Sequence, residues 1–199
     1  MRTLVRPDRV AALTGTVDLE SLKKRLRREP SASESDQGEP VAAVAIIINP
    51  NDRGGSILLI RRTERVGDPW SGQVAFPGGH KDHADRDLLA TAIREAREEV
   101  GIDVQEHELL GQLPVMFSRT RRVASYVFQL KADVAVQSND EVAESFWVPL
   151  STLNGINVSR TEVRAEESKL DVEAYVYNGN VIWGLTFRII NMLLNREKS

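Results

Sequence analysis

Short apolar runs, separated by glycine, proline and polar residues, occupy most of the chain after residue 40. The runs at 41–49 and 56–62 are rich in β-branched side chains and flank the turn-forming segment 50–55, which predicts two strands joined by a turn. Further strands are expected in four segments, at 109–117, 123–130, 146–149 and, as a hairpin around an Asn-Gly-Asn turn, 172–183. A sheet of many strands is therefore predicted.

Two helices are expected among and after these strands. Leu89, Ile93, Ala96 and Val100 recur at helical spacing, and Gly101 follows them as a stop signal. A closing helix is expected over 185–195. One helix embedded among strands and another at the end predict an α+β fold, with a mixed β-sheet sandwiched between α-helices.

The first 40 residues differ from the rest of the chain. Segment 18–28 carries Leu19, Leu22 and Leu26 on one side, which predicts a short helix docked on the main domain or on a second subunit. Segment 31–39 has almost no apolar residue and is typical of a flexible linker. We therefore expect an N-terminal helical extension and linker at 1–40 and the main domain at 41–199.

Composition narrows the class of protein. A chain of 199 residues with 41% hydrophobic residues can bury the core of one domain. It has no cysteine, so disulfides and thiolate metal sites are excluded. The longest apolar run, 41–48, is too short to span a membrane, and we expect a soluble, cytoplasmic protein. The net charge of −3 gives no general attraction to nucleic acid, which is not an expected partner.

Three glutamates, Glu95, Glu98 and Glu99, lie within about one turn of the first predicted helix. Like charges at this spacing repel one another, and the end of a helix disfavours anions further. A solvated helix face is the simplest interpretation. Glu99, however, falls at the edge of the apolar stripe, where a partly desolvated carboxylate needs a partner. The cluster thus indicates a site for a divalent cation and a phosphate substrate.

The segment from Gly79 to Ile102 resembles the Nudix box. Its second half matches that motif at seven positions, namely Arg94, Glu95, Ala96, Glu98, Glu99, Gly101 and Ile102. In the first half Asp85 takes the acidic position, and eight residues separate it from Arg94, one more than is usual. This longer box is similar to that of the coenzyme A diphosphatase subgroup, as are segments 58–63, 72–79 and 182–190. Between Thr63 and Gly72 the chain has one residue more than the subgroup's signature.

The resemblance implies a Nudix fold and a metal-dependent hydrolase that cleaves a diphosphate linkage in a nucleoside diphosphate derivative, here coenzyme A or its thioesters. ADP-ribose, other nucleoside diphosphate derivatives and nucleoside triphosphates stay open as substrates, as does a non-catalytic nucleotide sensor. The resemblance implies that Glu95, Glu98 and Glu99 hold Mg²⁺ or Mn²⁺ and that Arg94 pairs with one of these glutamates. The general base is either a box glutamate or one from a later loop, for which Glu141 and Glu144 are the candidates.

Substrate contacts are expected from two kinds of residue. The candidate phosphate-binding cations are Arg62, Arg119, Arg121 and Arg122. Gly78 and Gly79 are expected to form a tight loop with a backbone carbonyl near the metal. Trp70 and Trp183 are interpreted as packing residues, with base stacking as the alternative. A homodimer stays open.

Overall fold

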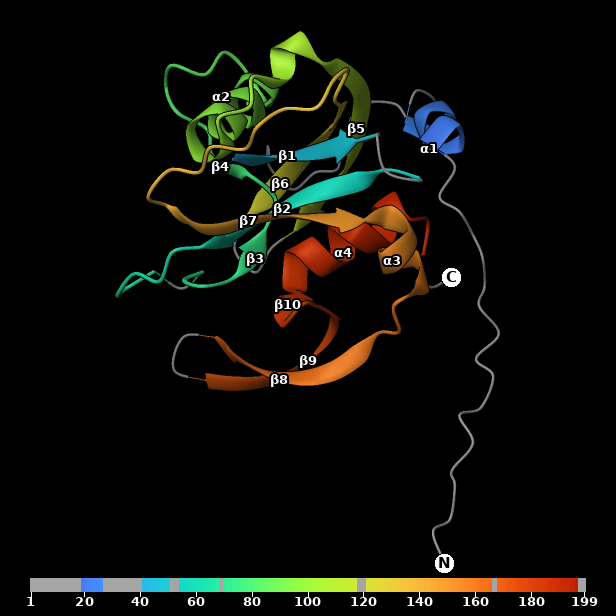
Figure 1. The fold of residues 1–199 in the computed structure, drawn as a ribbon. Helices are drawn as coiled ribbons and strands as arrows, with labels where there is room; N and C mark the ends of the chain where they lie inside the picture. Colours follow the sequence, from blue (N-terminus) through green and yellow to red (C-terminus); the bar gives the residue numbers. More distant parts are fainter. Residues whose placement is uncertain are drawn as a thin grey trace, which may run out of the picture.

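A computed structural model describes residues 19–26, 41–50, 54–68, 70–117, 121–165 and 168–196 (Figure 1). The predicted linker at 31–39 and Arg119 lie outside these ranges, so the proposed boundary near residue 40 stays a prediction. Among the described residues, no helix has the length and apolar character needed to cross a bilayer.

The central sheet is mixed, as predicted. Its strands are β1 Ala42–Asn49, β2 Ser56–Arg62, β3 Val74–Ala75, β4 Gly78–His80, β5 Glu108–Phe117, β6 Arg122–Gln129 and β7 Val142–Pro149. The order is β3-β2-β1-β6-β5, with β4 also paired to β1 and β7 to β2. Strand β1 runs parallel to β6 and antiparallel to β2 and β4. It is apolar at nearly every position because both faces of the sheet are covered.

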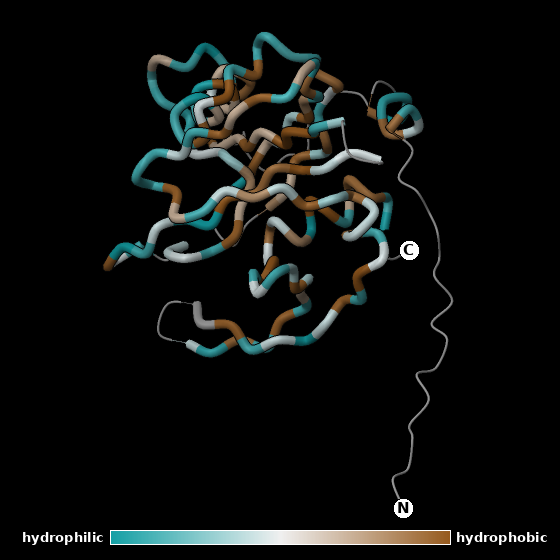
Figure 2. Tube along the Cα trace, viewed as in Figure 1, coloured by the Kyte–Doolittle hydropathy of each residue, from teal (hydrophilic) through white to brown (hydrophobic). Residues whose placement is uncertain are grey.

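Helices cover both faces of this sheet. Residues of α2 Leu88–Val100 and of the short 3₁₀ helix Val104–Glu106 share one core with the β1 side chains Ala45 and Ile47. Residues of α1 Leu19–Leu26, α3 Leu150–Gly155 and α4 Gly184–Leu193 share the other core with Ile46 and Ile48. Alternate side chains of β1 therefore pack into two separate cores, one on each face of the sheet. The predicted arrangement of a sheet sandwiched between helices is confirmed. Figure 2 shows the hydrophobic positions gathered in the strands and the inner sides of these helices.

A second, three-stranded antiparallel sheet was not expected. Strands β8 Ser159–Ala165, β9 Ser168–Tyr177 and β10 Asn180–Trp183 pair in the order β10-β9-β8. The predicted hairpin is β9 and β10, whose turn residues Asn178 and Gly179 have φ of 48° and 82°, as a tight hairpin turn requires. Strand β8 was not predicted because its sequence is mostly polar and charged, and its side chains at 159–163 are partly or fully exposed.

The expected tight loop at Gly78 and Gly79 is wrong: these residues belong to strand β4. A Cβ on Gly78 would lie 2.7 Å from Cα of Val44 on β1, so only glycine permits this close pairing. The predicted helix at 18–28 corresponds to α1, which docks on the main domain. Its Leu22 and Leu26 are buried, and Arg25 Nη2 donates to the Leu193 carbonyl at 2.6 Å, capping the C-terminal end of α4.

Candidate active site

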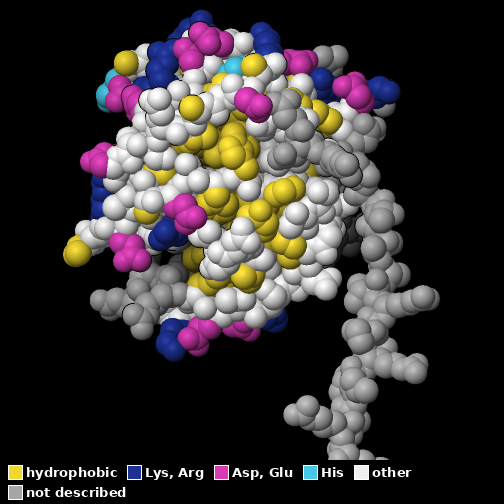
Figure 3. Space-filling model, in the orientation of Figure 1, with side chains coloured by type: hydrophobic (Ala, Val, Ile, Leu, Met, Phe, Trp, Pro, Cys, Tyr) yellow, Lys and Arg dark blue, Asp and Glu magenta, His cyan; other side chains and the backbone are white. Residues whose placement is uncertain are grey.

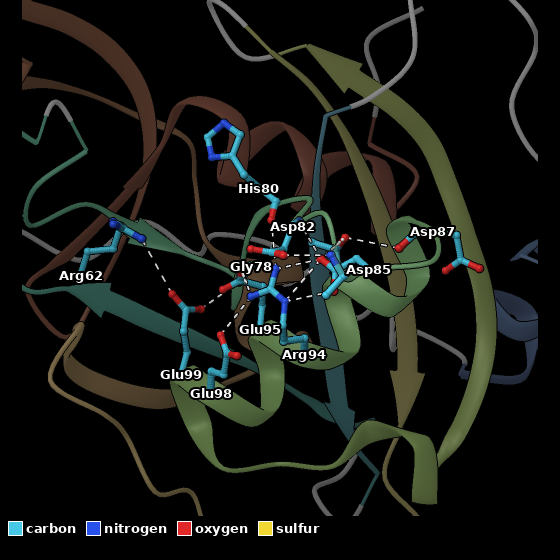
Figure 4. Close-up of polar contacts among 12 residues, drawn as sticks. Arg62, Gly78, His80, Asp82, Asp85, Asp87, Arg94, Glu95, Glu98 and Glu99 are labelled. Atoms are coloured by element: carbon cyan, nitrogen blue, oxygen red, sulfur yellow. Dashed lines mark hydrogen bonds and ion pairs between the residues drawn. The ribbon is translucent and has the colours of Figure 1, made fainter.

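Helix α2 carries the acidic cluster of Glu95, Glu98 and Glu99 and packs against the central sheet. Asp87 begins it by accepting a hydrogen bond from the Ala90 N–H at 2.8 Å, and Gly101 ends it with φ of 70°. Of the predicted stripe, Ala96 and Val100 are fully buried against the sheet, and Leu89 and Ile93 are partly buried beside them; Ala92, which was not predicted, is also fully buried. The box glutamates lie on the neighbouring face, where Glu99 points towards Gly78 and Glu95 and Glu98 point towards Arg94 (Figure 4).

Glu99 is the buried member of the cluster. It is 2% exposed, accepts a hydrogen bond from the Gly78 N–H at 2.8 Å, and has Arg62 Nη1 3.8 Å from its Oε1. Burial raises the pKa of Glu99 to about 8, against the smaller opposing effect of the Gly78 hydrogen bond. Burial also raises the pKa of Glu95. Both carboxylates would carry their charge more favourably beside a cation.

Arg94 links the cluster to the loop before α2. Its Nη1 donates to Glu95 at 2.9 Å and to Glu98 at 3.0 Å, and its Nε and Nη2 donate to Asp85 at 3.1 and 2.9 Å (Figure 4). Nη2 also donates to the His80 carbonyl at 3.0 Å. The Arg94 hydrogen bonds, chiefly, lower the pKa of Asp85 to about 2. As expected, Arg94 pairs with box glutamates.

The carboxylates are turned towards protein partners and not towards one another. Among the described side chains, no group of three histidines or acids is close enough to enclose a metal ion. The donor set nevertheless fits a hard divalent cation, because it consists of carboxylate oxygens on one helix face, two of them with charge disfavoured by burial.

A cavity of about 660 Å³ opens beside this cluster. Glu95, Glu99 and Glu141 give it an acidic lining, and Arg62, Arg121 and Arg188 give it cationic points. The rest of the lining includes the aromatic and apolar residues Trp70, Val74, Phe76, Phe117, Val123, Trp183 and Leu185. The cavity thus combines groups for cations, for anions and for planar or apolar parts of a ligand.

The structure brings only some of the predicted site residues to the cavity. Those that line it are Arg62, Gly78, Gly79, Glu95, Glu99, Arg121 and Glu141. Glu98 is exposed and bonded to Arg94, beside the cavity. Glu144 instead pairs with Arg61 at 3.2 Å and is absent from the lining. Arg122 is also absent and stacks on the Phe117 ring, 5.4 Å from its centroid.

Arg188 and Trp70 are among the cavity residues that were not assigned a site role from sequence. Arg188 of α4 lines the cavity and donates through Nη1 to the Phe117 carbonyl at 2.6 Å. Trp70, interpreted as a packing residue, is 36% exposed and lines the cavity. Arg188 lies in segment 182–190, which resembles the coenzyme A diphosphatase subgroup, and this resemblance was the only indication of Arg188 in the sequence.

The chain is similar to known proteins of one family. A family model described as the NUDIX domain matches residues 38–170. The chain is 40% identical over 143 residues to the uncharacterized Nudix hydrolase NudL of Photorhabdus laumondii, covering 69% of this chain and 75% of that protein. For NudL of Pectobacterium atrosepticum, identity is 34% over 160 residues, with 79% and 81% covered.

Among solved structures, the MutT protein of Methanosarcina mazei has 26% identity and a TM-score of 0.47, covering 62% of this chain and 86% of that chain. The match to the NUDIX domain spans more than half of the chain, and the similarity to the two relatives covers at least three quarters of their length. The chain therefore belongs to the Nudix family and is a Nudix hydrolase.

Proposed function

We propose that this hydrolase cleaves the diphosphate of coenzyme A or its thioesters, with Mg²⁺ or Mn²⁺ bound by Glu95, Glu98 and Glu99. The observation that carries the proposal is the buried carboxylate of Glu99, which lines the same cavity as Glu95 and three arginines. A buried anion beside other anions is costly, and a cation with its phosphate ligand offsets that cost.

The bound ion would neutralise the diphosphate and acidify a water molecule. Nudix hydrolases generally use divalent metals. In this chain Arg94 and Asp85 would hold the box glutamates in place from outside the cavity, as the residues behind a metal site commonly do. Arg62 would contact phosphate oxygens, since its guanidinium already faces Glu99 from the cavity lining.

Glu141 is our choice for the general base among the later glutamates. It lines the cavity, while its carbonyl accepts a hydrogen bond from the Thr63 N–H at 2.9 Å, which ties it to the end of β2. Arg65 Nη1 lies 3.6 Å from its carboxylate. A base must lie within reach of the attacking water, and Glu144 is turned away to Arg61.

Coenzyme A is favoured by sequence and supported by the cavity lining. The box with Asp85 and the segments 72–79 and 182–190 resemble the coenzyme A subgroup. Arg121 and Arg188 supply cations beyond those beside the glutamates, which suits a substrate with an additional phosphate. The face seen in Figure 3 has acidic and basic side chains intermixed around a hydrophobic centre and shows no continuous basic track for nucleic acid.

The proposal also includes the cellular location, the domain boundary and the oligomeric state. We propose that the protein acts in the cytoplasm, in keeping with the absence of cysteine. Residues 1–40 would be an extension that docks through α1, and residues 41–199 the catalytic domain. A homodimer stays open as an alternative to a monomer, and sedimentation measures which of the two forms in solution.

The test is a substrate screen in the presence of Mg²⁺ or Mn²⁺. Coenzyme A, its 3′-dephospho form, ADP-ribose and nucleoside triphosphates are compared by kcat/KM, with products identified by mass. The proposal expects coenzyme A to be preferred and to yield 3′,5′-adenosine diphosphate and 4′-phosphopantetheine. Arg121→Ala should lose the preference over the dephospho form, whereas Arg160→Ala, on the exposed strand β8, should keep it. A wild-type preference for ADP-ribose or a triphosphate would overturn the coenzyme A assignment.

A further inference from the structure

The loop between β2 and β3 presents an aromatic face to the cavity. Trp70 lies in this loop, is more than one-third exposed at 36%, and is part of the cavity lining. At this exposure part of the ring surface stays accessible from the cavity. Its position is therefore suited to contact with a ligand.

Hydrogen bonds fix the backbone of this loop. The Asp68 carboxylate accepts the Trp70 N–H at 3.0 Å and Arg62 Nη2 at 3.2 Å. Ser71 Oγ accepts the Arg65 N–H at 2.8 Å, and the Ser71 N–H donates to the Asp68 carbonyl at 3.0 Å. Arg62 in turn lies 3.8 Å from Glu99. Asp68 and Arg62 therefore connect the Trp70 backbone to the glutamates of the cavity.

A planar group already lies on the tryptophan ring. The Arg121 guanidinium stands 4.1 Å from the ring centroid, and its Nη1 is 3.5 Å from His80 Nδ1. Guanidinium groups and nucleobases stack on the same aromatic faces, since both are flat and electron-poor at their edges. At this separation the ring face has room for one planar group at a time.

We propose that Trp70 is the stacking platform for the nucleobase of the substrate, which takes the place of the Arg121 guanidinium. The displaced Arg121 then turns to a phosphate of the same ligand, while Asp68 holds the platform in position. The inference rests on the proposed function only in taking the substrate to carry a nucleoside; it does not depend on coenzyme A.

The test compares two ligands that differ only by the nucleoside. The affinities of the full chain for α,β-methylene-ADP and for methylenediphosphonate are measured by titration calorimetry with Mg²⁺ present, so that no turnover is needed. The ratio of the two affinities reports the nucleoside contribution. Trp70→Ala should reduce this ratio at least about fivefold, and Trp70→Phe should retain most of it. Trp147→Phe, at a partly buried tryptophan that packs against the α2 core and is absent from the cavity lining, is the control for Trp70→Phe and should leave it unchanged.

Other outcomes separate this inference from competing accounts. Equal weakening of both ligands by Trp70→Ala would indicate a merely structural role and overturn the proposal, as would an unchanged ratio. A loss of the ratio in Trp183→Ala but not in Trp70→Ala would place the base elsewhere and also overturn it. Arg121→Ala uncovers the ring and should not reduce the ratio; a reduction equal to that of Trp70→Ala would assign recognition to the guanidinium. If the ratio falls as expected while coenzyme A is not cleaved, the platform stands and the substrate assignment fails.

Discussion

Arg94 and Asp85 form a two-point ion pair, with Nε and Nη2 of the guanidinium 3.1 and 2.9 Å from the carboxylate oxygens. Asp85 is nearly buried and also accepts from Thr91 Oγ1 at 2.9 Å, so the pair is fixed from both sides. The remaining Arg94 nitrogen holds Glu95 and Glu98. An aspartate outside the cavity thereby controls where two carboxylates of the proposed metal site lie.

Asp85→Asn should therefore impair the site as well as the fold. The amide keeps the volume but loses the charge, and truncating a buried ion pair on one side costs about 3–5 kcal/mol of unfolding free energy in well-shielded cases. The effect here should be smaller, since Arg94 is partly exposed and keeps two other carboxylate partners. Urea unfolding measures the loss, and Mn²⁺ titration should show weaker binding. Unchanged metal affinity in a folded variant would contradict the positioning role.

Gly79→Ala should displace Glu95 without breaking the sheet. A Cβ at this position would come within 2.7 Å of Glu95 Cδ, and the flexible end of a glutamate can move away where backbone cannot. We expect lower metal affinity and lower turnover with a nearly native melting temperature. Gly155→Ala, at the open end of α3, is the matched control because nothing lies near its added Cβ. Equal metal affinity in both variants would exclude the steric link.

The pH dependence of stability should carry the signature of Glu99. Its folded pKa of about 8 exceeds the ordinary value of 4.5, so between these values the folded state binds more protons than the unfolded state. In metal-free buffer the free energy of unfolding should accordingly fall as the pH rises from about 5 to about 8. Glu99→Gln should flatten this decline. Chemical denaturation across that range measures it, and identical slopes in both proteins would contradict the assignment.

Metal ions should stabilise the protein by binding the folded state alone. The expected gain is RT ln(1 + [L]/Kd), so the melting temperature should rise with Mg²⁺ or Mn²⁺ concentration. Glu98→Gln should shrink the rise, because it removes one proposed ligand. Glu162→Gln, on exposed β8, should leave it intact. A shift of equal size in Glu98→Gln and wild type would argue that Glu98 is only a solvated partner of Arg94.

Much of the acidic cluster could be predicted from sequence because its three glutamates lie close together on one helix. The spacing of Glu95, Glu98 and Glu99 fixes their common face, and the position of Glu99 beside Ala96 correctly indicated burial. Other features depend on register between distant segments. Whether Arg61 or Arg62 faces the cavity is decided by the alternation of β2, and the choice between Glu141 and Glu144 by the pairing of β2 with β7. Likewise, β4 has three residues, too few for a periodic signal.

The most direct measurement is the turnover of Glu98→Gln and Glu99→Gln with Mn²⁺, alongside calorimetric titration of the same proteins with the ion. If these carboxylates hold a catalytic divalent cation, each variant should keep its fold, bind the ion more weakly and lose turnover by about two orders of magnitude or more. Full activity and unchanged metal affinity in both variants would contradict the account.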